Sequence, residues 1–241
     1  MKTGMIATLA GLAVAGSASA AFTGYVVTST NVTSGANALT VYTLWARFNG
    51  PTDTVLNAYN IAAVGGSSLS GFWHKDNAYY NSGVLSQEFG TWNPSQTGSV
   101  TLNRPFDSYL TIGGLATPTN TTNADPSWVS GGSGTGAGDS RSWNRPDIPN
   151  NGTSGWFNSN PPNNQGRVGL TGNTATDVRL GQFVLSQGHE GRTYSLTIGY
   201  NNGVAGSPVQ FGDGQFSFGV IPTPGAIALL GLAGLAGRRR R

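Results

Sequence analysis

The sequence predicts an all-β fold, an antiparallel β-sandwich of the jelly-roll-like type, on three observations. Only 10% of the residues are charged, and glycine is abundant, with 37 residues. Short runs of β-branched and aromatic residues recur between Gly, Asn and Pro turn signals. One run, residues 193–200, alternates strictly, with its large apolar side chains on one face. About eight to ten such strands favour two packed sheets over a helical fold.

The strongest expected strand is residues 39–48, which is apolar on both faces and is therefore expected to be central and covered on both sides. The sandwich is expected to close with a tight hairpin, in which Gly212-Asp213-Gly214 joins residues 209–211 to residues 215–220. The other expected strands are residues 25–28, 55–64, 69–73, 100–102, 108–112, 167–170, 178–185, 193–200, 209–211 and 215–220.

The middle of the chain, residues 116–164, shows neither strand nor helix periodicity and is rich in Gly and Asn. A flexible linker would not carry several large rings. We therefore expect a long loop that lies on the sandwich and is pinned to it by aromatic side chains. These are Trp128, Trp143, Trp156 and Phe157.

The N-terminus has the pattern of a secretory signal peptide, residues 1–20. Lys2 precedes a short apolar stretch, and Ala18-Ser19-Ala20 fits the small-residue cleavage pattern. The mature chain is expected to begin at Ala21, so that residues 21–219 form the β-sandwich domain. The chain has no cysteine, so core packing without disulfides has to hold this exported domain together.

The C-terminal residues 220–241 combine a Pro-x-Pro turn, an apolar helix-forming stretch and an arginine cluster. As a helix, residues 226–236 would be about 17 Å long. That is short against a hydrocarbon core of roughly 30 Å. The arginines are expected to stay at the cytoplasmic face of a membrane. They are Arg238, Arg239, Arg240 and Arg241.

This tail resembles the PEP-CTERM sorting signal of exported bacterial proteins, with Pro222, Thr223 and Pro224 in place of Pro-Glu-Pro. The resemblance implies an exosortase-type membrane processing enzyme as partner. It also implies delivery to the cell surface or the exopolysaccharide, with transient membrane anchoring through a short transmembrane helix. An ordinary C-terminal membrane anchor is the alternative. Segments at residues 40–61, 71–80 and 102–110 also look like stretches of other exported proteins that carry this tail.

The net charge of +3 comes from the two termini. Lys2 and the four terminal arginines are five of the thirteen basic residues, which leaves eight against ten acidic residues in the body. The body therefore has a net charge of −2, and no basic surface for nucleic acid is expected.

Candidate catalytic motifs are few. Trp73-His74-Lys75-Asp76 is interpreted as a strand end or turn with solvated charges, because neighbouring residues on a strand point to opposite faces. The pair at His189 and Glu190 is expected in a polar turn between strands. Other motifs lack the context they need: Gly138-Asp139-Ser140 has no nucleophile elbow, residues 131–138 have no phosphate-binding context, and no zinc spacing is present.

A glycosidase needs two paired carboxylates, for which Glu88, Glu190 and eight aspartates are available. Structural calcium could be bound by loop aspartates, although no calcium-loop motif is present. These aspartates are Asp139, Asp147, Asp177 and Asp213. Rings near polar segments are expected to pack internally for the most part, with sugar stacking as the alternative. They are Tyr79, Tyr80, Trp92, Trp128, Trp143 and Trp156.

We therefore predict a non-enzymatic, structural or adhesive component of the cell envelope or exopolysaccharide matrix. No catalytic residue, cofactor or metal ligand is assigned. A carbohydrate- or ice-binding module is one alternative, and a β-sandwich hydrolase is the other.

Overall fold

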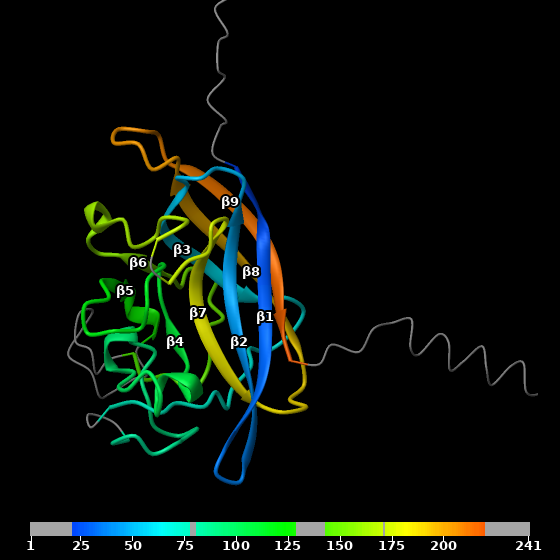
Figure 1. Cartoon of the computed structure of the whole chain (residues 1–241). Helices are drawn as coiled ribbons and strands as arrows, with labels where there is room; N and C mark the ends of the chain where they lie inside the picture. Colours follow the sequence, from blue (N-terminus) through cyan, green and yellow to red (C-terminus); the bar gives the residue numbers. More distant parts are fainter. Residues whose placement is uncertain (1–20, 78–80, 129–142, 171, 220–241) are drawn as a thin grey trace, which may run out of the picture.

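The computed structural model describes residues 21–77, 81–128, 143–170 and 172–219. Two antiparallel sheets pack face to face, so the predicted all-β sandwich is confirmed. Figure 1 shows β1, β2 and β7 in front of β3, β8 and β9. The four-stranded sheet consists of β1 (Phe22–Ser34), β2 (Asn37–Phe48), β7 (Asp177–Ser186) and β4 (Tyr109–Leu110). The five-stranded sheet consists of β5 (Thr122–Ala124), β6 (Trp156–Asn158), β3 (Thr54–Ala63), β8 (Arg192–Asn201) and β9 (Gln210–Phe218).

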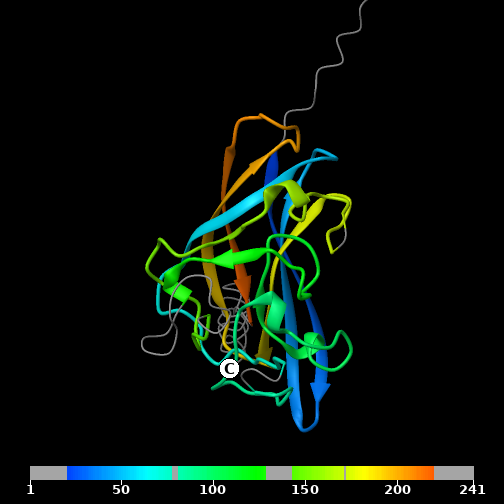
Figure 2. The same ribbon diagram turned by 90° about the vertical axis from the view of Figure 1, so that its left-hand side faces the viewer.

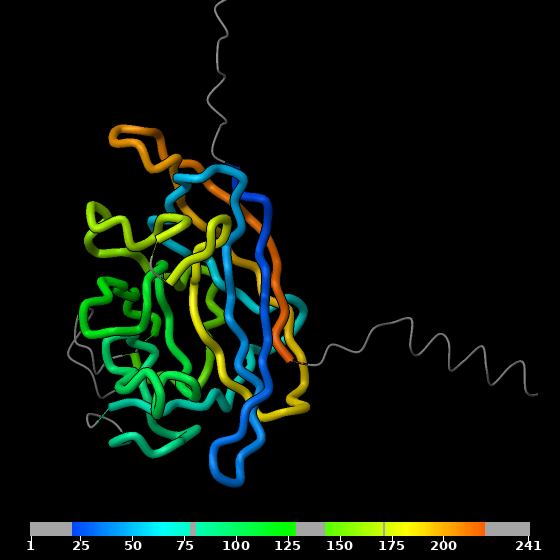
Figure 3. Tube along the Cα trace, viewed as in Figure 1, coloured from blue at the N-terminus to red at the C-terminus, as the bar shows by residue number. Residues whose placement is uncertain are grey.

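The strand predicted to be central, β2, lies between β1 and β7, as expected. One of its faces is core and carries Leu44 and Ala46, both without solvent exposure. The other face is only half-buried, so the expected cover on both sides is wrong. On that face the Arg179 guanidinium lies 4.9 Å from the centre of the Trp45 ring. The hairpin that joins β1 to β2 extends beyond the rest of the sheet, as the tube in Figure 3 shows.

The expected hairpin at Gly212-Asp213-Gly214 is wrong, because these residues lie inside the continuous strand β9 and pair with β8. The glycines are needed for space and not for a turn. A Cβ on Gly212 would lie 2.4 Å from the Phe22 ring, and one on Gly214 would lie 3.0 Å from the Tyr25 ring. These two rings of β1 close the sandwich over β9.

Several short strands were predicted wrongly. Residues 69–73, 100–102 and 167–170 form no strand and contribute only isolated bridges at Ser70 and Arg167. Residues 108–112 contribute only the two-residue strand β4. A short apolar run has the same composition whether it pairs in a ladder or packs as irregular chain, so the sequence alone does not separate the two.

Aromatic rings join the two sheets. The rings of Phe183 on β7 and Phe218 on β9 are 4.4 Å apart, and those of Phe48 on β2 and Tyr200 on β8 are 5.2 Å apart. All four side chains are at most 5% exposed. The alternation predicted for residues 193–200 is confirmed, because Tyr194, Leu196, Ile198 and Tyr200 are buried.

The described parts of the long middle segment, residues 116–128 and 143–164, gather at one side of the sandwich in Figure 1 and face the viewer in Figure 2. Trp128, Trp143 and Trp156 are buried, which confirms the predicted pinning, whereas Phe157 is 39% exposed. The segment also adds β5 and β6 to the five-stranded sheet, which the interpretation as a loop did not foresee.

The predictions for the two ends of the chain fall mostly outside the described residues. This applies to the signal peptide with Ala18 and Ala20, and to the whole sorting signal with its Pro-Thr-Pro motif and arginine cluster. Ala21 is described, and its backbone N–H donates to the side chain of Asn49 at 3.1 Å. In the part of the chain that the structure covers, no helix has the length and apolar character needed to span a membrane.

Candidate functional site

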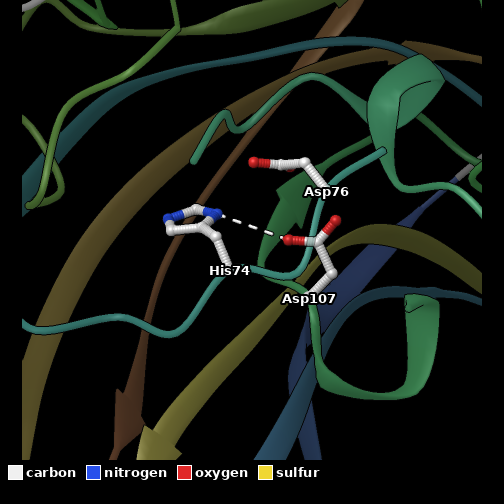
Figure 4. Close-up of side chains that lie close together, drawn as sticks. All are labelled: His74, Asp76 and Asp107. Atoms are coloured by element: carbon white, nitrogen blue, oxygen red, sulfur yellow. Dashed lines mark ion pairs between the residues drawn. The ribbon is translucent and has the colours of Figure 1, made fainter. Parts of the chain in front are cut away.

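Three potential metal ligands, His74, Asp76 and Asp107, lie together beside the four-stranded sheet, and we call them the buried cluster (Figure 4). Their potential ligand atoms all lie within 4.8 Å of one another. His74 and Asp76 are two positions apart on an extended segment, so their side chains share a face. Asp107 follows the short 3-10 helix η2 (Arg104–Phe106) as its C-terminal cap.

Backbone hydrogen bonds hold the two halves of the cluster against the sheet. The N–H of Trp73 donates to the carbonyl of Val184 on β7 at 2.8 Å. The N–H of Ser108 donates to the carbonyl of Trp73 at 3.0 Å. The residues next to His74 and Asp107 are thus joined directly, which brings together side chains more than thirty positions apart in the sequence.

The imidazole of His74 is wedged between Gly90 and Trp92. The rings of His74 and Trp92 are 5.0 Å apart and nearly perpendicular, at 86°. A Cβ on Gly90 would lie 2.1 Å from the Cβ of His74, so only glycine fits at this position. Trp92 is itself fixed by its indole N–H, which donates to the carbonyl of Arg145 at 2.8 Å.

Each carboxyl group of the cluster has one oxygen held by the backbone and one without a partner. The N–H of Thr91 donates to Oδ2 of Asp76 at 2.9 Å, and the N–H of Lys75 donates to Oδ1 of Asp107 at 3.1 Å. Oδ1 of Asp76, Oδ2 of Asp107 and both ring nitrogens of His74 are buried without a hydrogen-bond partner. Leaving such groups unsatisfied costs about 1–3 kcal/mol each.

Burial disfavours charge on all three side chains. Burial lowers the pKa of His74. The negative charge of Asp76 and the polar backbone of Ser108 and Thr91 raise this pKa, but their effect is weaker. Burial raises the pKa of Asp76 to about 9, and the neighbouring Asp107 adds to the shift. Burial likewise raises the pKa of Asp107 well above its ordinary value. Since burial disfavours charge on both groups, the 3.4 Å contact between Nδ1 of His74 and Oδ1 of Asp107 is not an ordinary ion pair.

The cluster corrects the interpretation of Trp73-His74-Lys75-Asp76 as solvated charges. His74 is 3% exposed and Asp76 is fully buried. The spacing of two between His74 and Asp76, next to the apolar Phe72 and Trp73, was the available signal. Asp107 had no such signal, since only the folded chain brings it to the other two.

A second feature lies on the outer face of the five-stranded sheet. The strand register places Phe157 of β6, Asn57 of β3, Gly199 of β8 and Phe211 of β9 in one row. Paired residues share a face, so the row spans about 14 Å at the usual strand spacing. Tyr59 lies two positions along β3 from Asn57, and its ring is 6.4 Å from that of Phe211.

We call Phe157, Tyr59 and Phe211 the aromatic strip. Phe157 is 39% exposed and Phe211 is 64% exposed. Between the rings, the Asn57 side chain lies over Gly199 and accepts its N–H at 2.9 Å, which leaves the amide NH₂ group as a donor. The strip therefore offers apolar ring faces and an amide within one row.

A hollow of about 190 Å³ adjoins the strip beside Phe157, and its lining includes Tyr59 and Asp125. The N–H of Ser127 donates to the Asp125 carboxylate at 2.8 Å, and the N–H of Gly155 also donates to it. The one acidic side chain in this lining is thus held in place by the backbone.

The structure does not bring together the loop aspartates considered for calcium. Asp177 pairs with Arg47 at 2.7 Å, Asp147 pairs with Arg145 at 3.0 Å, and Asp213 accepts from Thr197. Within the described ranges, the buried cluster is the only group of three metal-ligating side chains. Asp139, together with Ser140 and residues 131–138, lies outside the described residues.

The remaining candidate residues are separated or buried. Glu88 and Glu190 are exposed, and the latter lies with His189 in the predicted turn between β7 and β8. The four tryptophans considered for sugar stacking are at most 2% exposed, so internal packing is their role. They are Trp92, Trp128, Trp143 and Trp156. Tyr79 and Tyr80 lie outside the described residues.

Comparison of the chain with protein-family models, curated proteins and solved structures finds no match.

Proposed function

We propose that this protein is exported, is sorted by its PEP-CTERM-like tail, and acts as a non-enzymatic adhesive component of the cell envelope or exopolysaccharide matrix. Its body is a jelly-roll-like sandwich that binds polysaccharide chains on the outer face of the five-stranded sheet. The observation that carries the adhesive role is the aromatic strip, with Phe157 39% and Phe211 64% exposed.

The strip has the chemistry that a polysaccharide requires. Sugar rings carry apolar faces that pack on aromatic rings, and hydroxyl groups that exchange hydrogen bonds with amides. Phe157 and Phe211 supply the first kind of contact, and Asn57 supplies the second. A row of about 14 Å on an open sheet suits an extended polymer better than a small molecule.

The ice-binding alternative is less well supported. A flat ladder of repeated threonines would favour it, but the outer pairs of β8 and β9 include Ser195 with Gln215 and Thr197 with Asp213. A carboxylate and a long amide interrupt the repeat in this part of the sheet.

Burial supports a role without catalysis. Asp76 and Asp107 lie close enough to act as a carboxyl pair, yet both are fully buried. A glycosidase needs both carboxylates at the scissile bond. The hollow beside the strip has a single carboxylate in its lining, from Asp125, and two backbone N–H groups engage it.

Export and sorting rest on the sequence of the two ends. We expect cleavage before Ala21 and processing near Pro222, Thr223 and Pro224 by an exosortase-type enzyme, with the apolar helix holding the chain in the membrane beforehand. Mass spectrometry of the termini, in cells with and without the exosortase, tests this part. A tail that is retained in exosortase-positive cells would contradict it.

Affinity electrophoresis through gels that contain the cells' own exopolysaccharide tests the adhesive role. The wild-type protein should be retarded, and the double variant Phe157→Ala/Phe211→Ala should migrate as it does in a plain gel. Phe89→Ala is the matched control, because Phe89 is 62% exposed and lies outside the strip. Equal retardation of all three proteins would overturn the proposal.

A further inference from the structure

We propose that His74, Asp76 and Asp107 form a metal centre, which binds one divalent cation of the zinc type as the chain folds. The three side chains supply one nitrogen and two carboxyl groups, and their potential ligand atoms lie within 4.8 Å of one another. All three side chains point toward one common space in Figure 4.

The hydrogen bonds of the cluster follow the pattern of metal ligands oriented by their surroundings. One oxygen of each carboxyl group is fixed by a backbone N–H, from Thr91 for Asp76 and from Lys75 for Asp107. The other oxygen of each group is buried without a partner, as are both nitrogens of His74. Carboxylate ligands of bound metals are commonly hydrogen-bonded in this way.

The spacing also fits a small cation. Zinc is bound at about 2.0–2.2 Å by imidazole nitrogen and carboxylate oxygen, so that tetrahedral ligands lie about 3.4 Å apart. Nδ1 of His74 and Oδ1 of Asp107, the carboxyl oxygen that also accepts the N–H of Lys75, are 3.4 Å apart, which is long for a hydrogen bond and matches the separation of two tetrahedral ligands.

A proton shared between the two carboxyl groups is the competing account. Such a proton would engage one oxygen of each carboxyl group, but neither ring nitrogen of His74 would gain a partner from it. A cation accepts electron pairs from a ring nitrogen and from an oxygen of each carboxylate at once. Its two positive charges also balance the two carboxylates, which would otherwise be costly to bury.

The ligand set selects the kind of metal. Calcium takes six to eight oxygen ligands, whereas imidazole is typical of zinc and its transition-metal neighbours. Three protein ligands leave further positions for water or a backbone carbonyl. Since the cluster is almost closed to solvent, with His74 only 3% exposed, the ion is enclosed during folding.

The expected role of the ion is structural. It would join the segment that carries His74 and Asp76 to the chain that leads into β4 through Asp107. The chain has no cysteine for a disulfide. An ion that binds only the folded state stabilises it in proportion to the logarithm of its concentration over Kd.

The test uses the full chain, unfolded in urea with a chelator, freed of metal, and refolded with Zn²⁺, Ca²⁺ or no metal. We expect one Zn²⁺ per chain by native mass spectrometry and a higher Tm with Zn²⁺ than with Ca²⁺. The protein refolded with Co²⁺ should show the visible absorption of a tetrahedral site with nitrogen and oxygen ligands.

Asp76→Asn and His74→Gln should lower the affinity for Zn²⁺ at least tenfold. His189→Gln is the matched control, because the chain has two histidines and His189 lies in a turn away from the cluster. If a cluster variant does not fold, the cobalt spectrum of the wild type still decides the matter. Folded wild-type protein without bound Zn²⁺, a preference for Ca²⁺, or equal loss in His189→Gln would overturn the metal centre.

Discussion

Gly90 offers a direct test of how the cluster is built, through the substitution Gly90→Ala. The new Cβ would lie 2.1 Å from Cβ and 2.4 Å from Cγ of His74. Carbon atoms in contact normally lie about 3.5–4.0 Å apart. To restore such a separation, His74 or the segment that carries it has to move by more than about 1 Å. Trp92 lies on the imidazole and restricts where it can go.

Overpacking of this kind costs about 1–3 kcal/mol in the free energy of unfolding. Gly90 has a φ of +159°, so alanine there also carries a backbone cost. Gly24→Ala is the matched control, since Gly24 has a φ of +138° but no atom within 4 Å of the added Cβ. The difference between the two variants therefore isolates the collision with His74.

Urea denaturation measures both variants, with and without Zn²⁺. Gly90→Ala should be less stable than Gly24→Ala by about 1–3 kcal/mol. It should also lose most of the rise in stability that Zn²⁺ gives the wild type, because His74 is displaced. Equal stabilities of the two variants, together with an undiminished zinc effect, would refute the packing described for His74.

Two further predictions concern the sandwich itself. Gly212→Ala should lower the free energy of unfolding by about 1–3 kcal/mol, because the added Cβ would lie 2.4 Å from the Phe22 ring. The smaller side chain in the double variant Gly212→Ala/Phe22→Leu should restore part of this loss, as measured by urea denaturation. The hydrogen bond from Arg47 lowers the pKa of Asp177 in the folded protein. This pair therefore stabilises the fold fully at pH values above the ordinary carboxyl pKa, near 4. The stabilisation is lost as the pH falls through the lowered pKa that Asp177 has in the folded protein. Thermal melts of the wild type and Arg47→Met should differ slightly at pH 7, since Arg47 is half-exposed, and should converge in acid; a gap that widens in acid would contradict this sign.

The strands that the sequence predicted best are those whose side-chain pattern is fixed by burial. Residues 193–200 alternate because one face packs in the core, and Leu44 and Ala46 of β2 are apolar because their face packs in the core as well. Gly212 and Gly214 misled for a physical reason. A pair of glycines around an aspartate is typical of a turn, but here the missing side chains make room for Phe22 and Tyr25.

The buried cluster shows where sequence reasoning ends. His74 and Asp76 could be placed on one face from their spacing, but their burial depends on a segment that has no ladder periodicity. Asp107 reaches them through the hydrogen bond from Ser108 to Trp73, a tertiary contact that composition does not encode. The aromatic strip likewise follows from the register of β6, β3, β8 and β9, which only the structure supplies.

The most direct test of the proposed adhesive role is to map where the polysaccharide binds. Amide chemical shifts of the isotope-labelled protein would be followed during titration with oligosaccharides from the cells' exopolysaccharide. The account predicts that the largest shifts occur at residues 57–59, 156–158, 199 and 210–212, on the outer face of the five-stranded sheet. Shifts confined to another face, or no shifts at saturating oligosaccharide, would contradict it.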